Sequence, residues 1–224
     1  MTPKQSQSAP DKKRILLIDD HRMMREGLRQ LISHEPDLRV CCEAADARQA
    51  LACIAKGKPD LALLDISLPD KNGLELLKDI RALDPRLPVL VVSMHDENLY
   101  AERVLRAGGR GYIMKHEGGE KLMQAMRHVL AGQAYVSGPM SSRILDNLTG
   151  HRRAAARSSV EKLTDREFEV FRLIGQGNGT RQIAEKLRVS VKTVEVHRLN
   201  IKRKLVLKTA TQLIRAAVRW AESR

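Results

Sequence analysis

The first 131 residues alternate between short apolar runs and longer stretches with helical spacing. Three of the apolar runs, Ile15–Ile18, Leu61–Leu64 and Val89–Val92, are continuous rather than alternating. That pattern is typical of parallel strands that are buried on both faces. Leu38–Ala44 and Gly111–Met114 are weaker strand candidates, and each gap between candidates leaves room for one helix. Five such units predict an α/β domain with an open, doubly wound, five-stranded parallel sheet.

The pattern changes after residue 131. Residues 132–159 carry three glycines, a proline and a basic stretch of small residues, which indicates a linker. From Leu163 onward the apolar positions follow helical spacing, and Ala210–Ala221 reads as a closing amphipathic helix. We therefore expect a disordered tail at 1–12, the α/β domain at 13–131, the linker at 132–159 and a small all-α domain at 160–224.

Four helix starts are indicated by N-cap residues. Asp46-Ala-Arg-Gln49 and Thr164-Asp-Arg-Glu167 have the sequence of capping boxes, in which the two side chains satisfy free backbone N–H groups. Thr180 and Ser190 are the candidate N-caps of two short helices in the second half.

Charge separates the two halves as the apolar pattern does. The whole chain carries a formal net charge of +13. Residues 1–150 contribute +2 and residues 151–224 contribute +11. A nearly neutral first domain and a strongly basic second domain indicate that the second binds a polyanion, although a merely soluble basic surface would have the same charge.

The cysteines and the chain ends favour a cytoplasmic protein. The three cysteines, Cys41, Cys42 and Cys53, are odd in number and lack metal-ligand or redox spacing, so we expect buried thiols in a reducing compartment. The polar residues 1–11 have no apolar core of a signal peptide. No apolar run approaches the length of a membrane span, and no membrane association is expected.

Polar residues follow the predicted strands at the edge of the sheet where ligands bind in open α/β folds. Asp19 and Asp20 follow the first strand, Asp65 the third and Lys115 the fifth, while Ser93 ends the fourth. Three carboxylates this close would repel one another unless a cation lay among them, and oxygen ligands suit Mg²⁺. Asp65 stands alone after the central strand and is the candidate nucleophile toward a phosphoryl group, whose charge Mg²⁺ and Lys115 would offset.

These residues resemble a known family. Residues 14–131 are similar to the flavodoxin-like receiver domain of response regulators, through Ile18-Asp-Asp-His21, Leu64-Asp-Ile-Ser-Leu-Pro-Asp-Lys-Asn-Gly73, Ser93 and Gly111-Tyr-Ile-Met-Lys115. The resemblance implies that Asp65 accepts the phosphoryl group. It also implies that Asp20, Asp65 and the Ser67 carbonyl ligate Mg²⁺, with Asp19 in the metal shell, and that Ser67 and His95 tune the phosphoryl lifetime.

Tyr112 is a candidate switch residue. It lies three positions before Lys115, and an odd offset on a strand places two side chains on opposite faces. Lys115 can then face the phosphoryl pocket while Tyr112 faces a neighbouring helix. The receiver family uses an aromatic residue here as a two-position reporter coupled to the Ser93 hydroxyl, and the alternative is a tyrosine that serves packing alone.

The predicted helix from Val191 to about Leu205 has two faces. Val194, Ile201 and Leu205 share one stripe and should be core, whereas the other face mixes cations with apolar side chains. Such a surface suits the major groove, where phosphates and thymine methyl groups lie together; the alternative is a solvated helix. The residues of this second face are Lys192, Glu195, Val196, Leu199, Lys202 and Arg203.

A second resemblance covers residues 160–221. Leu163-Thr-Asp-Arg-Glu-Phe-Glu-Val170, Ile183-Ala-Glu-Lys-Leu187 and Ser190-Val-Lys-Thr-Val-Glu-Val-His197 through Lys204-Leu205 are similar to the helix-turn-helix domain of LuxR-type (NarL/FixJ) regulators. The resemblance implies that Val191–Leu205 is the recognition helix. Phosphate contacts are then expected from Lys192, Thr193, Lys202 and Lys204, and base contacts from Glu195, Val196 and Leu199.

Together these features predict a transcription regulator of a bacterial two-component system. We expect a histidine kinase and double-stranded promoter DNA as partners, a homodimer on DNA or after phosphorylation, with Ala210–Ala221 as a candidate pairing surface, and possible contact with RNA polymerase. We expect no metabolic enzyme, because the receiver acts only on its own phosphorylation and dephosphorylation. One alternative is a Mg²⁺-dependent phosphatase, but adjacent Asp19 and Asp20 do not fit its usual spacing. Another is a DNA-binding protein that no longer depends on phosphorylation.

Overall fold

The computed structural model describes residues 12–148 and 159–222, so the expected tail, apart from Lys12, lies outside the described residues. Two compact units divide between Ser142 and Arg143. The domain limits drawn from the sequence remain predictions. Helix α6, Gly138–Leu148, lies inside the stretch interpreted as a linker, and the rest of that linker up to residue 158 is not described.

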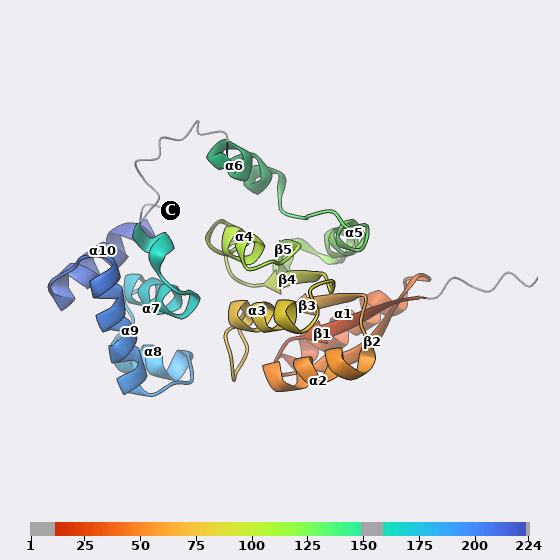
Figure 1. Cartoon of the computed structure of the whole chain (residues 1–224), viewed down its shortest axis with the longest axis horizontal. Coiled ribbons are helices and arrows are strands. Elements are labelled where there is room, and N and C mark those ends of the chain that lie inside the picture. The colour runs from red at the N-terminus through yellow and green to blue at the C-terminus, as the bar shows by residue number, and fades with distance from the viewer. Residues whose placement is uncertain (1–11, 149–158, 223–224) are drawn as a thin grey trace, which may run out of the picture. The chain divides into compact units, whose positions relative to one another are not determined.

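The first unit is built on a parallel sheet with the order β2-β1-β3-β4-β5 (Figure 1). All five predicted strands are confirmed, and β3 and β4 are buried at every position, as their continuous apolar runs require. The strands are β1 (Lys13–Ile18), β2 (Leu38–Ala44), β3 (Leu61–Leu64), β4 (Val89–Ser93) and β5 (Gly111–Met114).

Helices cover both faces of this sheet. One face packs against α1 (Arg22–Ser33) and α5 (Gly119–Leu130), whose Ile32 and Met126 are fully buried against strand residues such as Leu63. The strand side chains that alternate with these pack toward the remaining helices. Those helices are α2 (Ala47–Gly57), α3 (Gly73–Leu83) and α4 (Glu97–Arg106), and the short 3-10 helix η1 (Lys115–Glu117) follows β5.

The chain after α5 returns along the free edge of β5. The backbone N–H of Tyr112 donates to the carbonyl of Tyr135 at 2.9 Å, and the N–H of Tyr135 donates to the carbonyl of Arg110 at 3.0 Å. Two residues later, the N–H of Ser137 donates to Oε1 of buried Glu97 at 2.7 Å. The start of the expected linker is therefore tied to β5 and to the first residue of α4.

The cysteine prediction was wrong. Cys42 of β2 and Cys53 of α2 form a disulfide, with their Cα atoms 6.2 Å apart, and only Cys41 is a free, half-buried thiol. The two residues are eleven positions apart and match no redox motif. Packing of α2 against β2 brings them together, which the spacing along the chain does not reveal.

The second unit is helical throughout its described residues. Its elements are η3 (Ser159–Lys162), α7 (Asp165–Gly175), α8 (Thr180–Lys186), α9 (Val191–Lys204) and α10 (Ala210–Glu222). Phe168 and Phe171 of α7 pack edge-on against Trp220 of α10, with ring centroids 5.5 and 5.7 Å apart. Gly175 permits this close contact, because a Cβ there would lie 2.6 Å from the carbonyl oxygen of Ala217.

Three of the four predicted helix starts are confirmed. The side chains of Asp46, Thr164 and Ser190 each accept a hydrogen bond from the backbone N–H three residues later. The fourth was wrong by one position, because Gly179 occupies the N-cap of α8 and Thr180 is the first helical residue. Gly179 can take the cap position because the Gln182 side chain accepts from its N–H at 2.9 Å.

Among the described residues, no helix combines the length and the apolar character that crossing a bilayer requires.

Candidate functional site

Three carboxylates and an ammonium group meet at the carboxyl end of the sheet. Asp19 and Asp20 come directly after β1, Asp65 after β3 and Lys115 after β5. Nζ of Lys115 lies 2.6 Å from Oδ2 of Asp19 and 2.7 Å from Oδ2 of Asp65, and all three side chains are at least nine-tenths buried. The predicted cluster therefore forms in space from residues that are up to 96 positions apart.

The second oxygen of Asp65 has no hydrogen-bond partner. Its Oδ1 is buried and unpaired, although Oδ2 is held by Lys115. Burial raises the pKa of Asp65 above its ordinary value, because desolvation and the nearby Asp19 charge outweigh the attraction of Lys115. Burial alone would lower the pKa of Lys115, but the two carboxylates overcome this effect and raise it. A buried oxygen without a partner has the position and the chemistry of a nucleophile or a cation ligand.

The loop after Asp65 fixes its position through a close backbone contact. The N–H of Gly73 donates to the carbonyl of Ile66 at 2.9 Å, and a Cβ at Gly73 would lie 2.6 Å from both Asp65 O and Ile66 Cα. Asn72 is buried and caps α3 by accepting from the N–H of Leu74. Position 73 therefore requires a glycine. The sequence motif includes this glycine, but the spacing of the motif does not give the reason for it.

Ser67, on the loop after β3, and Ser93, the last residue of β4, flank the cluster. The hydroxyl of Ser67 lies 3.1 Å from Nε2 of His95, whose ring stacks on Tyr100 with centroids 4.8 Å apart. Ser93 is fully buried, and its hydroxyl accepts from the N–H of His95 at 3.4 Å. The β4–α4 segment thus links both predicted serines through His95.

The side chain of Tyr112 is buried beside the β4–α4 segment. It is fully buried, and its hydroxyl donates to the backbone carbonyl of His95 at 2.8 Å. Burial raises the pKa of Tyr112 far above its ordinary value, with a smaller opposing effect from a hydrogen bond with Ser93. Lys115 and Tyr112 therefore point to different partners, the carboxylates and the β4–α4 segment respectively.

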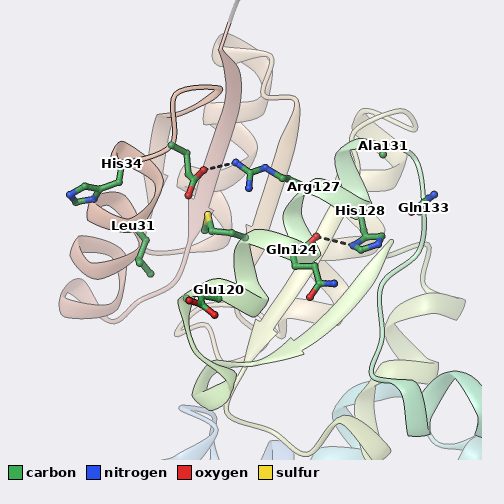
Figure 2. A pocket seen from close by; sticks show the side chains of 11 residues that line it. Leu31, His34, Glu120, Gln124, Arg127, His128, Ala131 and Gln133 are labelled. Atoms are coloured by element: carbon green, nitrogen blue, oxygen red, sulfur yellow. Dashed lines mark hydrogen bonds and ion pairs between the residues drawn. The ribbon is translucent and has the colours of Figure 1, made fainter.

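A groove of about 780 Å³ lies between α1 and α5, and Figure 2 shows the side chains that line it. Leu31 and Met123 line it, and Arg127 bridges to Glu35 and Asp37 at one end. None of the residues that line this groove belongs to the acidic cluster.

Helix α9 presents the predicted mixed surface. Val194 and Ile201 are fully buried as expected, whereas Leu205 is only half-buried and forms the C-cap. Val196 and Leu199 are about half exposed, at 49% and 51%. Around them lie the exposed Lys192, Glu195 and Arg203 and the half-buried Thr193 and Lys202.

Lys204 belongs to a different environment from the rest of this surface. Its Nζ lies 2.6 Å from Oε2 of Glu167, a buried residue of α7. The same oxygen accepts from the backbone N–H of Thr164 at 2.8 Å. Burial alone would raise the pKa of Glu167, but these hydrogen bonds outweigh it and lower the pKa. Lys204 thus connects α9 to a buried residue of α7, a contact that its place in a basic run did not suggest.

Comparison with known families agrees with both units. Residues 15–127 match the response regulator receiver domain, and residues 161–217 match the bacterial regulatory proteins of the luxR family. The chain belongs to the LuxR-type response regulators. This response regulator combines a receiver with a LuxR-type DNA-binding domain, the organisation of a transcription regulator.

Relatives of this response regulator match from 62% to 92% of its length. The oxygen regulatory protein NreC of Staphylococcus haemolyticus (strain JCSC1435) is 34% identical over 92% of this chain and 97% of its own. A LuxR-family two-component response regulator from Aurantimonas sp. SI85-9A1 covers 62% of this chain and 99% of its own, with a TM-score of 0.58 and 34% identity. RcsB of Salmonella enterica serovar Typhimurium, solved bound to promoter rprA with BeF3-, covers 92% of this chain and 98% of its own, with a TM-score of 0.61; at 24% identity it supports the fold alone.

Proposed function

We propose that this response regulator accepts a phosphoryl group on Asp65 from a histidine kinase and thereby controls the binding of its helix-turn-helix to promoter DNA. The observation that carries the proposal is the buried, unpaired Oδ1 of Asp65 among acidic neighbours, next to the Lys115 ammonium. The protein would work in the cytoplasm, where the kinase's phosphohistidine and the chromosome are both present.

The transfer uses side chains that already lie at the cluster. An Asp65 oxygen attacks phosphorus while the bond from phosphorus to the kinase histidine nitrogen breaks, which forms an acyl phosphate on Asp65. Lys115 stabilises the negative charge on the phosphoryl oxygens, and the Ser93 hydroxyl donates to one of them. Water later attacks phosphorus, the bond from phosphorus to the Asp65 oxygen breaks, and inorganic phosphate leaves, which restores the carboxylate. Ser67 and His95 lie where they would affect the access of that water.

The same residues fit a magnesium ion. Asp20 and Asp65 would hold the ion through carboxylate oxygens. By the family resemblance, the Ser67 carbonyl would add a third oxygen and Asp19 would lie in the metal shell; such oxygen ligands are those that Mg²⁺ prefers. When bound, Mg²⁺ supplies positive charge beside the phosphoryl oxygens. The orphaned Oδ1 of Asp65 supports this assignment, because a buried carboxylate oxygen without a donor is costly unless a cation is near.

Tyr112 would carry the signal away from the pocket. Its hydroxyl and the Ser93 hydroxyl both engage the β4–α4 segment at His95, so movement of Ser93 toward a phosphoryl oxygen changes the surroundings of Tyr112. Glu97 lies two residues after His95, and its carboxylate accepts a hydrogen bond from the backbone N–H of Ser137. Ser137 belongs to the chain segment that leads to the second unit. Phosphorylation could then alter the pairing of the DNA-binding domains, with α10 as the candidate dimer surface and RNA polymerase as a further partner.

The proposal is tested by coupling between phosphorylation and DNA affinity. DNA is first selected from a random-sequence pool by protein treated with an acyl phosphate and Mg²⁺. We expect the treatment to raise the affinity of the wild type for the selected DNA about tenfold, and to leave Asp65→Asn unchanged. Equal affinity of wild type with and without the acyl phosphate would instead support a phosphorylation-independent DNA-binding protein.

Lys202 and Lys204 should respond differently to replacement by Ala. Lys202→Ala should weaken binding to all DNA sequences and lower the slope of log affinity against log salt by roughly 0.9, because one phosphate contact is lost. Lys204→Ala should instead lower the free energy of unfolding of the DNA-binding domain by about 2 kcal/mol, because it leaves buried Glu167 without its cation. Salt-dependent DNA titrations and chemical denaturation separate the two effects.

The pH dependence of stability provides a control for the Lys204 prediction. A carboxyl whose pKa is lower in the folded protein contributes stability above its ordinary pKa of 4.5, and that contribution is lost as the pH falls through the lowered value. Lys204→Ala should therefore flatten this part of the stability profile. An unchanged profile, or an unchanged salt slope in Lys202→Ala, would contradict the corresponding assignment.

A further inference from the structure

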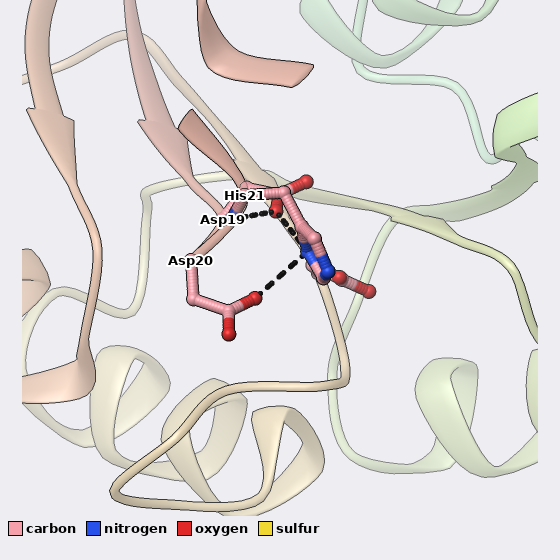
Figure 3. Close-up of side chains that lie close together, drawn as sticks. Asp19, Asp20 and His21 are labelled. Atoms are coloured by element: carbon pink, nitrogen blue, oxygen red, sulfur yellow. Dashed lines mark hydrogen bonds and ion pairs between the residues drawn. The ribbon is translucent and has the colours of Figure 1, made fainter. Parts of the chain in front are cut away.

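The imidazole of His21 lies against the acidic cluster (Figure 3). Its Nδ1 is 2.9 Å from Oδ1 of Asp20 and 3.2 Å from Oδ1 of Asp19. One ligand atom from each of Asp19, Asp20, His21 and Asp65 can be chosen so that all four lie within 4.8 Å of one another. The side chain of His21 is 66% exposed, so solvent and small ions can reach it.

Helix capping does not account for the orientation of this ring. His21 is the N-cap residue of α1, but its side chain makes no capping hydrogen bond. Its backbone N–H donates to Oδ1 of Asp19 at 2.8 Å, which fixes the turn that carries the imidazole toward the carboxylates. A residue placed only to start the helix would direct its polar atom to the free backbone N–H groups.

The separations suit ligands of a shared ion. In a six-coordinate site with metal–ligand bonds of about 2.1 Å, neighbouring ligand atoms lie about 3 Å apart. The contacts of Nδ1 with the carboxylates, an ion pair with Asp20 at 2.9 Å and a hydrogen bond with Asp19 at 3.2 Å, also have this size. The buried Oδ1 of Asp65, which has no hydrogen-bond partner, independently indicates a ligand position in the same cluster.

An imidazole nitrogen changes which ions the cluster prefers. Carboxylate and carbonyl oxygens suit Mg²⁺, whereas imidazole favours first-row transition metals such as Co²⁺ and Zn²⁺. We propose that Nδ1 of His21 is a ligand of this centre and gives it a mixed nitrogen and oxygen site for divalent transition-metal ions. The proposal rests on the proposed function only in using the same carboxylates, and it assigns to the site a class of ion other than Mg²⁺.

The test is a titration of the full chain with Co²⁺, followed by calorimetry and by the visible absorption of the ion. All variants carry Cys41→Ser, which removes the one free thiol of the described chain as a competing ligand. His21→Gln retains a side chain that can donate to Asp19 or Asp20 but removes the imidazole nitrogen. His34→Gln is the matched control, because His34 is an exposed histidine whose Nδ1 lies 2.7 Å from the carbonyl oxygen of Gln30 in α1.

We expect His21→Gln to lower Co²⁺ affinity at least about tenfold and to change the absorption spectrum, while Mg²⁺ affinity changes less than about threefold. His34→Gln should match the parent in all three measurements. Equal Co²⁺ affinity and spectra in His21→Gln and its parent would overturn the proposal. Equal losses of Co²⁺ and Mg²⁺ affinity would overturn it too, because they would indicate damage to the carboxylate cluster rather than loss of a nitrogen ligand.

This experiment is independent of phosphoryl transfer. It contains no phosphoryl donor, so a protein that fails to be phosphorylated can still show the His21-dependent Co²⁺ site. Conversely, a protein that is phosphorylated with Mg²⁺ but binds Co²⁺ equally well in His21→Gln would refute only the nitrogen ligand.

Discussion

Replacing Asp65 by Asn should reduce labelling by a radioactive acyl phosphate at least about a thousandfold, to background. The substitution preserves the shape of the side chain but removes the anionic oxygen that attacks phosphorus. Oδ1 of Asp65 is buried and has no hydrogen-bond partner, so this oxygen is available to attack phosphorus. The measurement is incorporation of label in the presence of Mg²⁺, with release by hydroxylamine as the signature of an acyl phosphate.

Asp70→Asn is the matched control for this experiment. Asp70 lies on the same loop, but its carboxylate accepts from the N–H of Ala47 at the start of α2, at 3.0 and 3.1 Å. Asn can make the same bond through its carbonyl oxygen, so labelling should stay close to wild type. Label on Asp65→Asn at the wild-type level would place the acceptor elsewhere. Absence of label on folded wild type would favour the phosphorylation-independent alternative.

Replacing Lys115 by Met should lower the free energy of unfolding of the receiver by about 3 kcal/mol in the presence of a chelator. The ammonium group lies 2.6 and 2.7 Å from two carboxylates that are each 4% exposed, and it is itself 7% exposed. Without it, Asp19 and Asp65 would remain buried beside Asp20 with no cation to offset their repulsion. Chemical denaturation followed by circular dichroism measures the change.

Added Mg²⁺ should restore much of the lost stability of Lys115→Met, because the ion binds the folded cluster and not the unfolded chain. Lys121→Met is the control. Lys121 pairs with Glu117 at 3.1 Å, but its side chain is 59% exposed, so its replacement should have little effect on unfolding. Equal stability of Lys115→Met and wild type in chelator would mean that the buried ion pairs make no net contribution.

Much of this fold could be predicted from short-range patterns. The runs at 15–18, 61–64 and 89–92 are apolar at every position because strands covered on both faces have no solvent side, and the structure buries them completely. The caps at Asp46, Thr164 and Ser190 are local, because donor and acceptor lie three residues apart. Parallel strands end at the same edge of a sheet, so the cluster at Asp19, Asp65 and Lys115 could also be expected before any contact was known.

Other features depend on packing between distant segments. Lys204 looks like one cation in a basic run, yet it pairs with Glu167, which is 37 residues away and is brought near by the packing of α7 on α9. The disulfide between Cys42 and Cys53 likewise depends on α2 lying against β2.

The sequence by itself determined the five strands, the helical second half, the acidic cluster and the resemblance to response regulators, because each rests on local periodicity or on the shared direction of parallel strands. Only the tertiary structure decided which side chains are in contact with one another. The hydrogen bond from the Ser137 N–H to Glu97 depends on how segments 40 residues apart pack, and the 2.9 Å contact of His21 with Asp20 depends on the turn after β1. Such contacts depend on how the turns fold and how the elements pack, and no short pattern of residue types along the chain predicts them.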